Sequence, residues 1–201
     1  MPFGWSDLLR GNRFWAPVSE SALVDAGNAA ELRGGLTLIE LSCGHGAAAL
    51  FLAEEFHLYA RGFDDQRGVI EDAREIAVRS PAGRRVRFFH GEASGPVDVV
   101  CSLRRTVGAS LVRGGGSLLL GRFMRDGEVP DPPGGDVVWR REATPLEWER
   151  FCLPQERALR AYRRTLKPRD EVSPIALAAA QQIDAFRSSR VAYELSVVRI
   201  G

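Results

Sequence analysis

The chain has 201 residues, with 27 basic and 26 acidic side chains and a formal net charge of +1. A chain of this length fits one domain whose core needs neither a metal nor disulfides. The near-neutral balance gives no electrostatic reason to expect nucleic acid or an anionic membrane as a partner, and we predict neither. Lys167 is the only lysine. We interpret that bias as the composition of a GC-rich bacterial genome.

The N-terminus and the cysteines indicate a cytoplasmic protein. Residues 1–7 show no basic stretch followed by an apolar one, so no signal peptide is predicted. The longest apolar run, 47–53, is too short to cross a bilayer. Cysteines at 43, 101 and 152 have neither CxxC spacing nor an even number, which favours reduced thiols. No His, Cys and Asp cluster has the spacing of metal ligands, so no metal is predicted.

Helical and strand patterns alternate along the first 121 residues. Helices are predicted at 19–32, 46–56 and 67–79, and strands at 36–41, 58–63, 84–90, 97–103 and 117–121. This alternation indicates an α/β fold with a doubly wound, mostly parallel, Rossmann-like sheet.

The last third of the chain has a different pattern. Its prolines and glycines predict a loop over 126–145, with a short strand at 136–139. Helices at 146–166 and 174–189 follow, and an alternating strand at 191–200 ends the chain.

The most informative segment is 38–46, which reads LIELSCGHG. An apolar strand that ends in a glycine-rich turn before a helix typically holds a nucleotide-like cofactor. Gly44 to Ala49 match the dinucleotide pattern G-x-G-x-x-G/A, and Asp64 follows at the spacing of a ribose-binding acid. Glu40 argues against a dinucleotide, because a carboxylate at the strand end would repel a pyrophosphate. It suits a cofactor that carries ammonium and sulfonium charge.

With these residues the chain resembles a class I S-adenosylmethionine-dependent methyltransferase of the small-molecule type. The motifs that carry the resemblance occur in order at 38–46, 62–64 (GFD), 91–93 (GEA), 97–101 (VDVVC) and 111–121 (LVRGGGSLLLG). The family also ends in an antiparallel strand. The resemblance therefore implies one domain, with a cap segment over 1–35, a cofactor-binding core over 36–121, and a lid loop, helices and last strand over 122–201.

The resemblance also implies roles for individual residues. Glu40 would face the methionine end of the cofactor, Gly44 and Gly46 would allow close backbone approach, and Asp64 would hold the ribose hydroxyls. Glu92 would accept from the adenine amino group. The full set implied for S-adenosylmethionine is Glu40, Ser42, Cys43, Gly44, Gly46, Asp64, Asp65, Glu92, Ala93, Cys101 and Ser102.

Each residue also has a purely structural interpretation, which the sequence leaves open. The glycines can serve a tight strand-to-helix turn, and Asp64 can cap a helix. Glu92 can be a solvated turn residue, and Cys101 a core cysteine on a buried strand.

The chain departs from the family pattern in three places. Ser42 replaces the first glycine of the motif at 38–46. The connections at 93–97 and 104–112 are too short for the usual helices, so the adenine side should be open, or covered by a second subunit in a homodimer. Arg104, Arg105 and Arg122 follow the fourth and fifth strands, where the family often has polar, aromatic or acidic residues.

Two interpretations of the arginines stay open. They can bind a small anionic substrate by bidentate hydrogen bonds, with Phe14 and Trp15 as lid residues. Alternatively the domain has lost turnover and serves as a cofactor-binding or protein-interaction module. We predict methyl transfer from S-adenosylmethionine to a small acceptor, with S-adenosylhomocysteine as product and no catalytic residue assigned. A nicotinamide-dependent oxidoreductase is a third alternative, which Glu40 disfavours.

Overall fold

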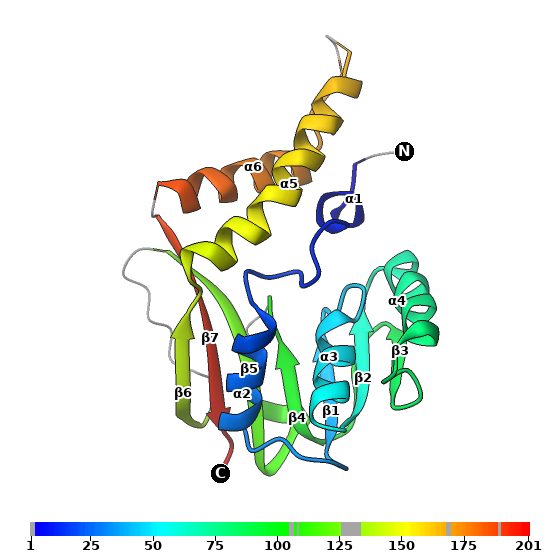
Figure 1. Cartoon of the computed structure of the whole chain (residues 1–201), viewed down its shortest axis with the longest axis vertical. Coiled ribbons are helices and arrows are strands. Elements are labelled where there is room, and N and C mark those ends of the chain that lie inside the picture. The colour runs from blue at the N-terminus through cyan, green and yellow to red at the C-terminus, as the bar shows by residue number, and fades with distance from the viewer. Residues whose placement is uncertain (1–2, 105–106, 108, 126–133, 168–169, 189) are drawn as a thin grey trace.

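A computed structural model describes residues 3–104, 107, 109–125, 134–167, 170–188 and 190–201. Its strands form one sheet in the order β3-β2-β1-β4-β5-β7-β6 (Figure 1). The strands are β1 (Thr37–Leu41), β2 (Tyr59–Asp64), β3 (Val86–His90), β4 (Val97–Ser102), β5 (Val112–Arg125), β6 (Asp136–Glu142) and β7 (Val191–Arg199). The first five pair in parallel, and β7 runs antiparallel to β5 and β6. The predicted fold class is confirmed.

The helices agree with the sequence patterns to within a few residues. They are α1 (Trp5–Leu9), α2 (Glu20–Ala29), α3 (Ala47–Glu55), α4 (Arg67–Arg79), α5 (Pro145–Thr165) and α6 (Pro174–Arg187). Of these six helices, α1 alone was not predicted. In the described part of the β4–β5 connection, the short 3₁₀ helix η1 (Ala109–Leu111) was also not predicted. Within the described ranges, none of these helices has the length and apolar character needed to span a membrane.

The loop predicted over 126–145 is wrong in its second part. Residues 126–133 lie outside the described part of the chain, but β6 continues beyond the expected strand to Glu142. Half-buried residues alternate with exposed ones along β6, which is the pattern of an edge strand packed on one face. Its partner β7 also extends the pairing of β5 to Arg125. β5 and β6 are longer than their own sequence patterns predict. The reason is that both pair with β7, which comes from a distant part of the chain.

The two faces of the sheet are covered differently. In Figure 1, α2 and α3 lie in front of the sheet and α4 lies beside β2 and β3. Their buried residues, among them Leu23, Leu52 and Ile70, belong to the main core. The opposite face carries a smaller apolar cluster around Ile39 and Leu118, which in the described part of the chain includes no side chain from α1–α6. The β3–β4 connection contains no helix, as its length predicted.

The cap segment packs against both the C-terminal helices and the sheet: α1 lies beside α5, and α2 lies in front of the sheet (Figure 1). Figure 1 shows α5 and α6 beyond one end of the sheet, with α1 beside α5. Leu8 and Leu9 of α1 are fully buried. The ring of Phe3 stacks on Tyr162 of α5 at a centroid distance of 4.4 Å. The N-terminal residues are therefore anchored on α5 before the chain descends to α2.

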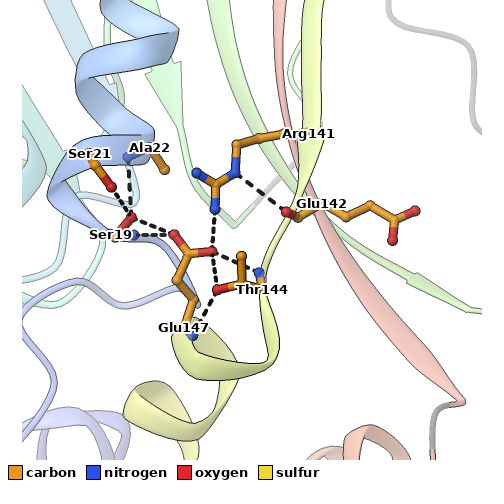
Figure 2. A network of polar contacts seen from close by, with 7 residues as sticks. All are labelled: Ser19, Ser21, Ala22, Arg141, Glu142, Thr144 and Glu147. Atoms are coloured by element: carbon orange, nitrogen blue, oxygen red, sulfur yellow. Dashed lines mark hydrogen bonds and ion pairs between the residues drawn. The ribbon is translucent and has the colours of Figure 1, made fainter.

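Glu147 joins the beginnings of α2 and α5 (Figure 2). Its Oε1 accepts from the Ser19 backbone N–H at 3.1 Å, and its Oε2 accepts from the Thr144 backbone N–H at 2.8 Å and from Arg141. Ser19 and Thr144 are the N-caps of the two helices. Burial raises the pKa of Glu147, but the hydrogen bonds from Ser19 and Thr144 and the charge of Arg141 outweigh it and lower the pKa below its ordinary value.

We expect Glu147→Gln to lower the free energy of unfolding by about 2 kcal/mol at neutral pH, because it weakens charge-assisted hydrogen bonds. The folded-state pKa is depressed, so this contribution is complete above the ordinary pKa of glutamate. It is lost as the pH falls through the folded-state value. Denaturant unfolding at neutral and acidic pH measures it. The control is Glu142→Gln, because that exposed side chain points away from the network in Figure 2. If both variants changed the free energy of unfolding equally, the stabilising role that we assign to Glu147 would be contradicted.

Candidate cofactor site

The turn at 42–46 connects the end of β1 to the start of α3. Ser42, Gly44 and Gly46 have φ values of 53°, 54° and 75°. All three lie in the left-handed region, which glycine enters without a Cβ clash. Ser42 therefore carries a strain of roughly 1–2 kcal/mol at a position where glycine is the relaxed choice. The departure of Ser42 from the motif keeps the turn conformation and adds a hydroxyl to its surface.

Asp64 joins three segments at the carboxyl edge of the sheet. Its Oδ2 accepts from the Gly44 N–H and its Oδ1 from the Gln66 N–H, both at 3.0 Å. Its backbone carbonyl accepts from the Gly91 N–H at 2.9 Å. The N-cap of α4 is Gln66, so Asp64 holds the glycine turn rather than capping the helix itself. Each carboxylate oxygen keeps a second lone pair, with which it can accept from a pair of hydroxyls.

Glu40 is a buried acid at the end of β1, with 4% of its surface exposed. Its Oε2 accepts from the Ala49 N–H in the first turn of α3 at 2.8 Å. Burial raises its pKa, the Ala49 hydrogen bond lowers it and the charge of Asp64 raises it, with a result of about 8. Among the described residues no arginine, lysine or histidine forms an ion pair with it. Its negative charge is therefore suppressed until a cation lies beside it.

The cysteines of the predicted site are buried thiols. Cys101 on β4 pairs with Glu40 in the strand register, and Cys101 and Ser102 have no exposed surface. Burial raises the pKa of Cys43 and of Cys101 far above the ordinary range, and the charge of Glu40 adds to this. Both thiols therefore stay protonated, and they can line the wall of the site but cannot act as nucleophiles.

The remaining residues of the predicted adenosine side lie farther along the same edge. Asp65 and Glu92 are exposed, and Ala93 is half-buried. Gly91 has a φ of 108°, which turns the chain sharply after β3 and starts the segment that carries Glu92. The structure thus brings Glu40 and Asp64 into direct contact with the turn and its helix, and places Asp65, Glu92 and Ala93 on adjoining connections.

Arg104 and Arg122, the predicted arginines that the structure describes, make different contacts. Arg105 lies outside the described residues. Arg122 on β5 is buried, and its Nη2 donates to Glu194 of β7 at 2.8 Å. Its positive charge is therefore paired with a carboxylate on the neighbouring strand. Glu194 was not identified from the sequence, although a single acid within the apolar strand at 191–198 indicates a buried carboxylate that needs a partner. The Arg104 guanidinium lies over the rings of Trp5 and Trp15, at 4.9 and 5.9 Å from their centroids.

Phe14 and Trp15 pack close to the turn. The Phe14 ring meets Phe51 of α3 edge-on at 6.1 Å, and Trp15 meets the ring of His45 at 4.9 Å. The cavity that Trp15, Glu40 and Arg104 border is only about 10 Å³. That space holds about one water molecule. In the described ranges no group of three His, Cys, Asp or Glu side chains is placed to hold a metal ion.

Comparison with known proteins identifies the fold through structure alone. No family model and no curated protein matches the chain. The structure is similar to the S-adenosylmethionine-dependent methyltransferases of Thiobacillus denitrificans and Geobacter sulfurreducens, both solved with S-adenosyl-L-homocysteine. Each is 18% identical with a TM-score of 0.75, and the matches cover 99% and 98% of this chain and 98% and 99% of the two neighbours. The fold is therefore that of class I S-adenosylmethionine-dependent methyltransferases, as the motifs predicted.

The same fold also occurs in a protein with another named activity. The [4+2]-cyclase SpnF is 15% identical with a TM-score of 0.68, over 95% of this chain and 85% of the cyclase. The fold thus defines a class of structure, and the chemistry has to be argued from the site.

We expect Glu40→Gln to raise the free energy of unfolding, and to raise it more as the pH increases. The folded-state pKa of about 8 lies above the ordinary value of 4.5, so the folded chain binds the extra proton. Between these two values the wild type therefore loses about 1.4 kcal/mol per pH unit through this group, and the variant does not. Denaturant unfolding across this range measures the difference. The control is Glu54→Gln, an exposed site on α3. Parallel curves for wild type and Glu40→Gln would show that Glu40 is ionised in the folded state.

Proposed function

We propose that the chain binds S-adenosylmethionine against the turn at 42–46 and transfers its methyl group to a small acceptor. The observation that carries this proposal is that two acidic side chains lie close to the glycine turn. Buried Glu40, which has no basic partner among the described residues, and Asp64, which is bonded to Gly44, lie at the same edge of the sheet. Two solved neighbours with this fold hold S-adenosylhomocysteine.

The chain's residues fit an adenosyl cofactor with positive charge. Glu40 would hold the charged methionine end, because a nearby cation stabilises the ionised carboxylate. The lone pairs that Asp64 keeps would accept from the ribose hydroxyls. Glu92 and the Ala93 backbone would meet the adenine. A pyrophosphate would instead approach Glu40 with like charge, and this supports the adenosyl cofactor over a nicotinamide one.

The bound cofactor supplies an electrophilic methyl group, and the chain's own contribution is chiefly positioning. Cys43, Cys101 and Ser102 would form the wall beside the methyl group and exclude water. Because both thiols stay protonated, neither competes with the acceptor for the methyl group.

The acceptor that we propose is small and negatively charged. Arg104 supports this assignment because it borders the same cavity as Glu40. Arg122 supports it less, because Glu194 matches its charge. An anion beside Arg104 would also offset the repulsion between this arginine and the cofactor's positive charge.

Calorimetric titration tests cofactor binding. We expect heats with S-adenosylmethionine and S-adenosylhomocysteine and none with NAD. Asp64→Asn should weaken S-adenosylhomocysteine binding by about tenfold or more, which corresponds to about 1.4 kcal/mol, because it removes a charged acceptor. The matched control, Asp25→Asn on the exposed side of α2, should bind like the wild type. Lack of heat with both adenosyl ligands would contradict the proposal, and unchanged affinity in Asp64→Asn would contradict the ribose assignment.

A domain that binds the cofactor without turnover is the second candidate, and the narrow cavity beside Trp15 favours it. A screen of small carboxylate and phenolate acceptors for release of S-adenosylhomocysteine separates the two. We expect release with at least one anionic acceptor, and a loss of at least about tenfold in Arg104→Gln, because the acceptor's charged partner is removed. Tight binding without release across the screen would favour the silent domain.

A further inference from the structure

Residues 10–18 form an irregular strap that joins α1 to α2 and carries Trp15. We propose that Trp15 is an intramolecular plug: the indole ring and the cofactor compete for the same surface of the glycine turn, so the strap has to move before the cofactor binds. The inference rests on the proposed function, because it concerns access to the same site.

The first observation is the position of the indole ring. A Cβ built on Gly44 would lie 2.7 Å from Cδ2 and 2.8 Å from Cε3 of Trp15, so the ring lies directly against this glycine. Trp15 is only 7% exposed, and it also packs against the ring of His45. Gly44 has no side chain and therefore permits close approach to its backbone, but the Trp15 ring already occupies that position.

The second observation is the charge next to the ring. The Arg104 guanidinium lies over Trp15 and Trp5, and Arg104 borders the same cavity as Glu40. A positively charged ligand end beside Glu40 would meet both the ring and this cation, and a cavity of about 10 Å³ has no room for it. Ligand entry therefore requires both Trp15 and Arg104 to shift.

The third observation is that the strap is incompletely hydrogen-bonded. The buried Trp15 Nε1 and Asn12 Oδ1 have no hydrogen-bond partner among the described residues. Such groups destabilise the state that buries them, because their hydrogen bonds to water are lost without replacement. Asn12 Nδ2 does donate to the Phe151 carbonyl at 2.9 Å, and Gly11 packs on Pro154, so α5 provides the main attachment.

The strap has fixed ends between which it can move. Fully buried Leu8 and Leu9 hold α1, which packs against α5. At the other end, Glu147 holds Ser19 at the start of α2. Opening is thereby confined to the intervening segment. A plug of this kind reduces the apparent affinity for the cofactor by the fraction of molecules that are open.

Calorimetry with S-adenosylhomocysteine tests the plug through affinity. We expect Trp15→Ala to bind at least about tenfold more tightly than the wild type, because the competing ring is removed. The control, Trp139→Ala, removes a half-buried indole from β6 and should leave the affinity unchanged. Equal or weaker binding by Trp15→Ala, with the wild type binding normally, would overturn the plug alone. Lack of binding by both proteins would overturn the proposed function together with it.

A second measurement needs no stable alanine variant. The chain contains four tryptophans, so labelling with 5-fluorotryptophan gives four fluorine resonances, and Trp15→Phe identifies the one from Trp15. We expect S-adenosylhomocysteine to move this resonance to a solvent-exposed position, with a larger shift between H₂O and D₂O. A Trp15 resonance that stays equally shielded, or becomes more shielded, would overturn the plug.

Discussion

The Asp64 carboxylate is the contact on which the candidate site depends. Parallel strands end at one edge of a sheet, and the order β3-β2-β1 places the end of β2 between its two neighbours. From that position Asp64 bonds the turn after β1, the start of α4 and, through its carbonyl, the turn after β3. The two hydrogen bonds to the carboxylate are charge-assisted and contribute about 1.5–3 kcal/mol each. Together with the carbonyl bond to Gly91 they hold three connections in one arrangement.

Near Asp64, several polar residues are in energetically unfavourable states. Glu40 is buried with a raised pKa, and the Trp15 N–H has no acceptor among the described residues. Ser42 has a backbone conformation that favours glycine. Departures from local stability that lie together are typical of a functional site. A cationic ligand rich in hydroxyl donors would ionise Glu40 and use the free lone pairs of Asp64, and its arrival would expose Trp15 to water.

The sequence could indicate those parts of the candidate site that lie on one local pattern. The strand, turn and helix around Gly44, and the acid after the next strand, could be recognised because spacing along the chain sets them. The pairing of Arg122 with Glu194 and the length of β6 could not, since both depend on where β7 enters the sheet. The position of Trp15 on Gly44 was equally hidden, because it depends on how α1 and α5 hold the strap.

The central claim is that the edge of the sheet formed by Glu40, Gly44 and Asp64 holds an adenosyl cofactor. A crystal structure of the chain with S-adenosylhomocysteine tests it most directly. We predict that the ribose hydroxyls lie within hydrogen-bonding distance of Asp64, that the methionine end lies toward Glu40, and that the indole of Trp15 has left Gly44. A ligand bound elsewhere, or bound without any contact to Asp64, would contradict the assignment of this edge as the cofactor site.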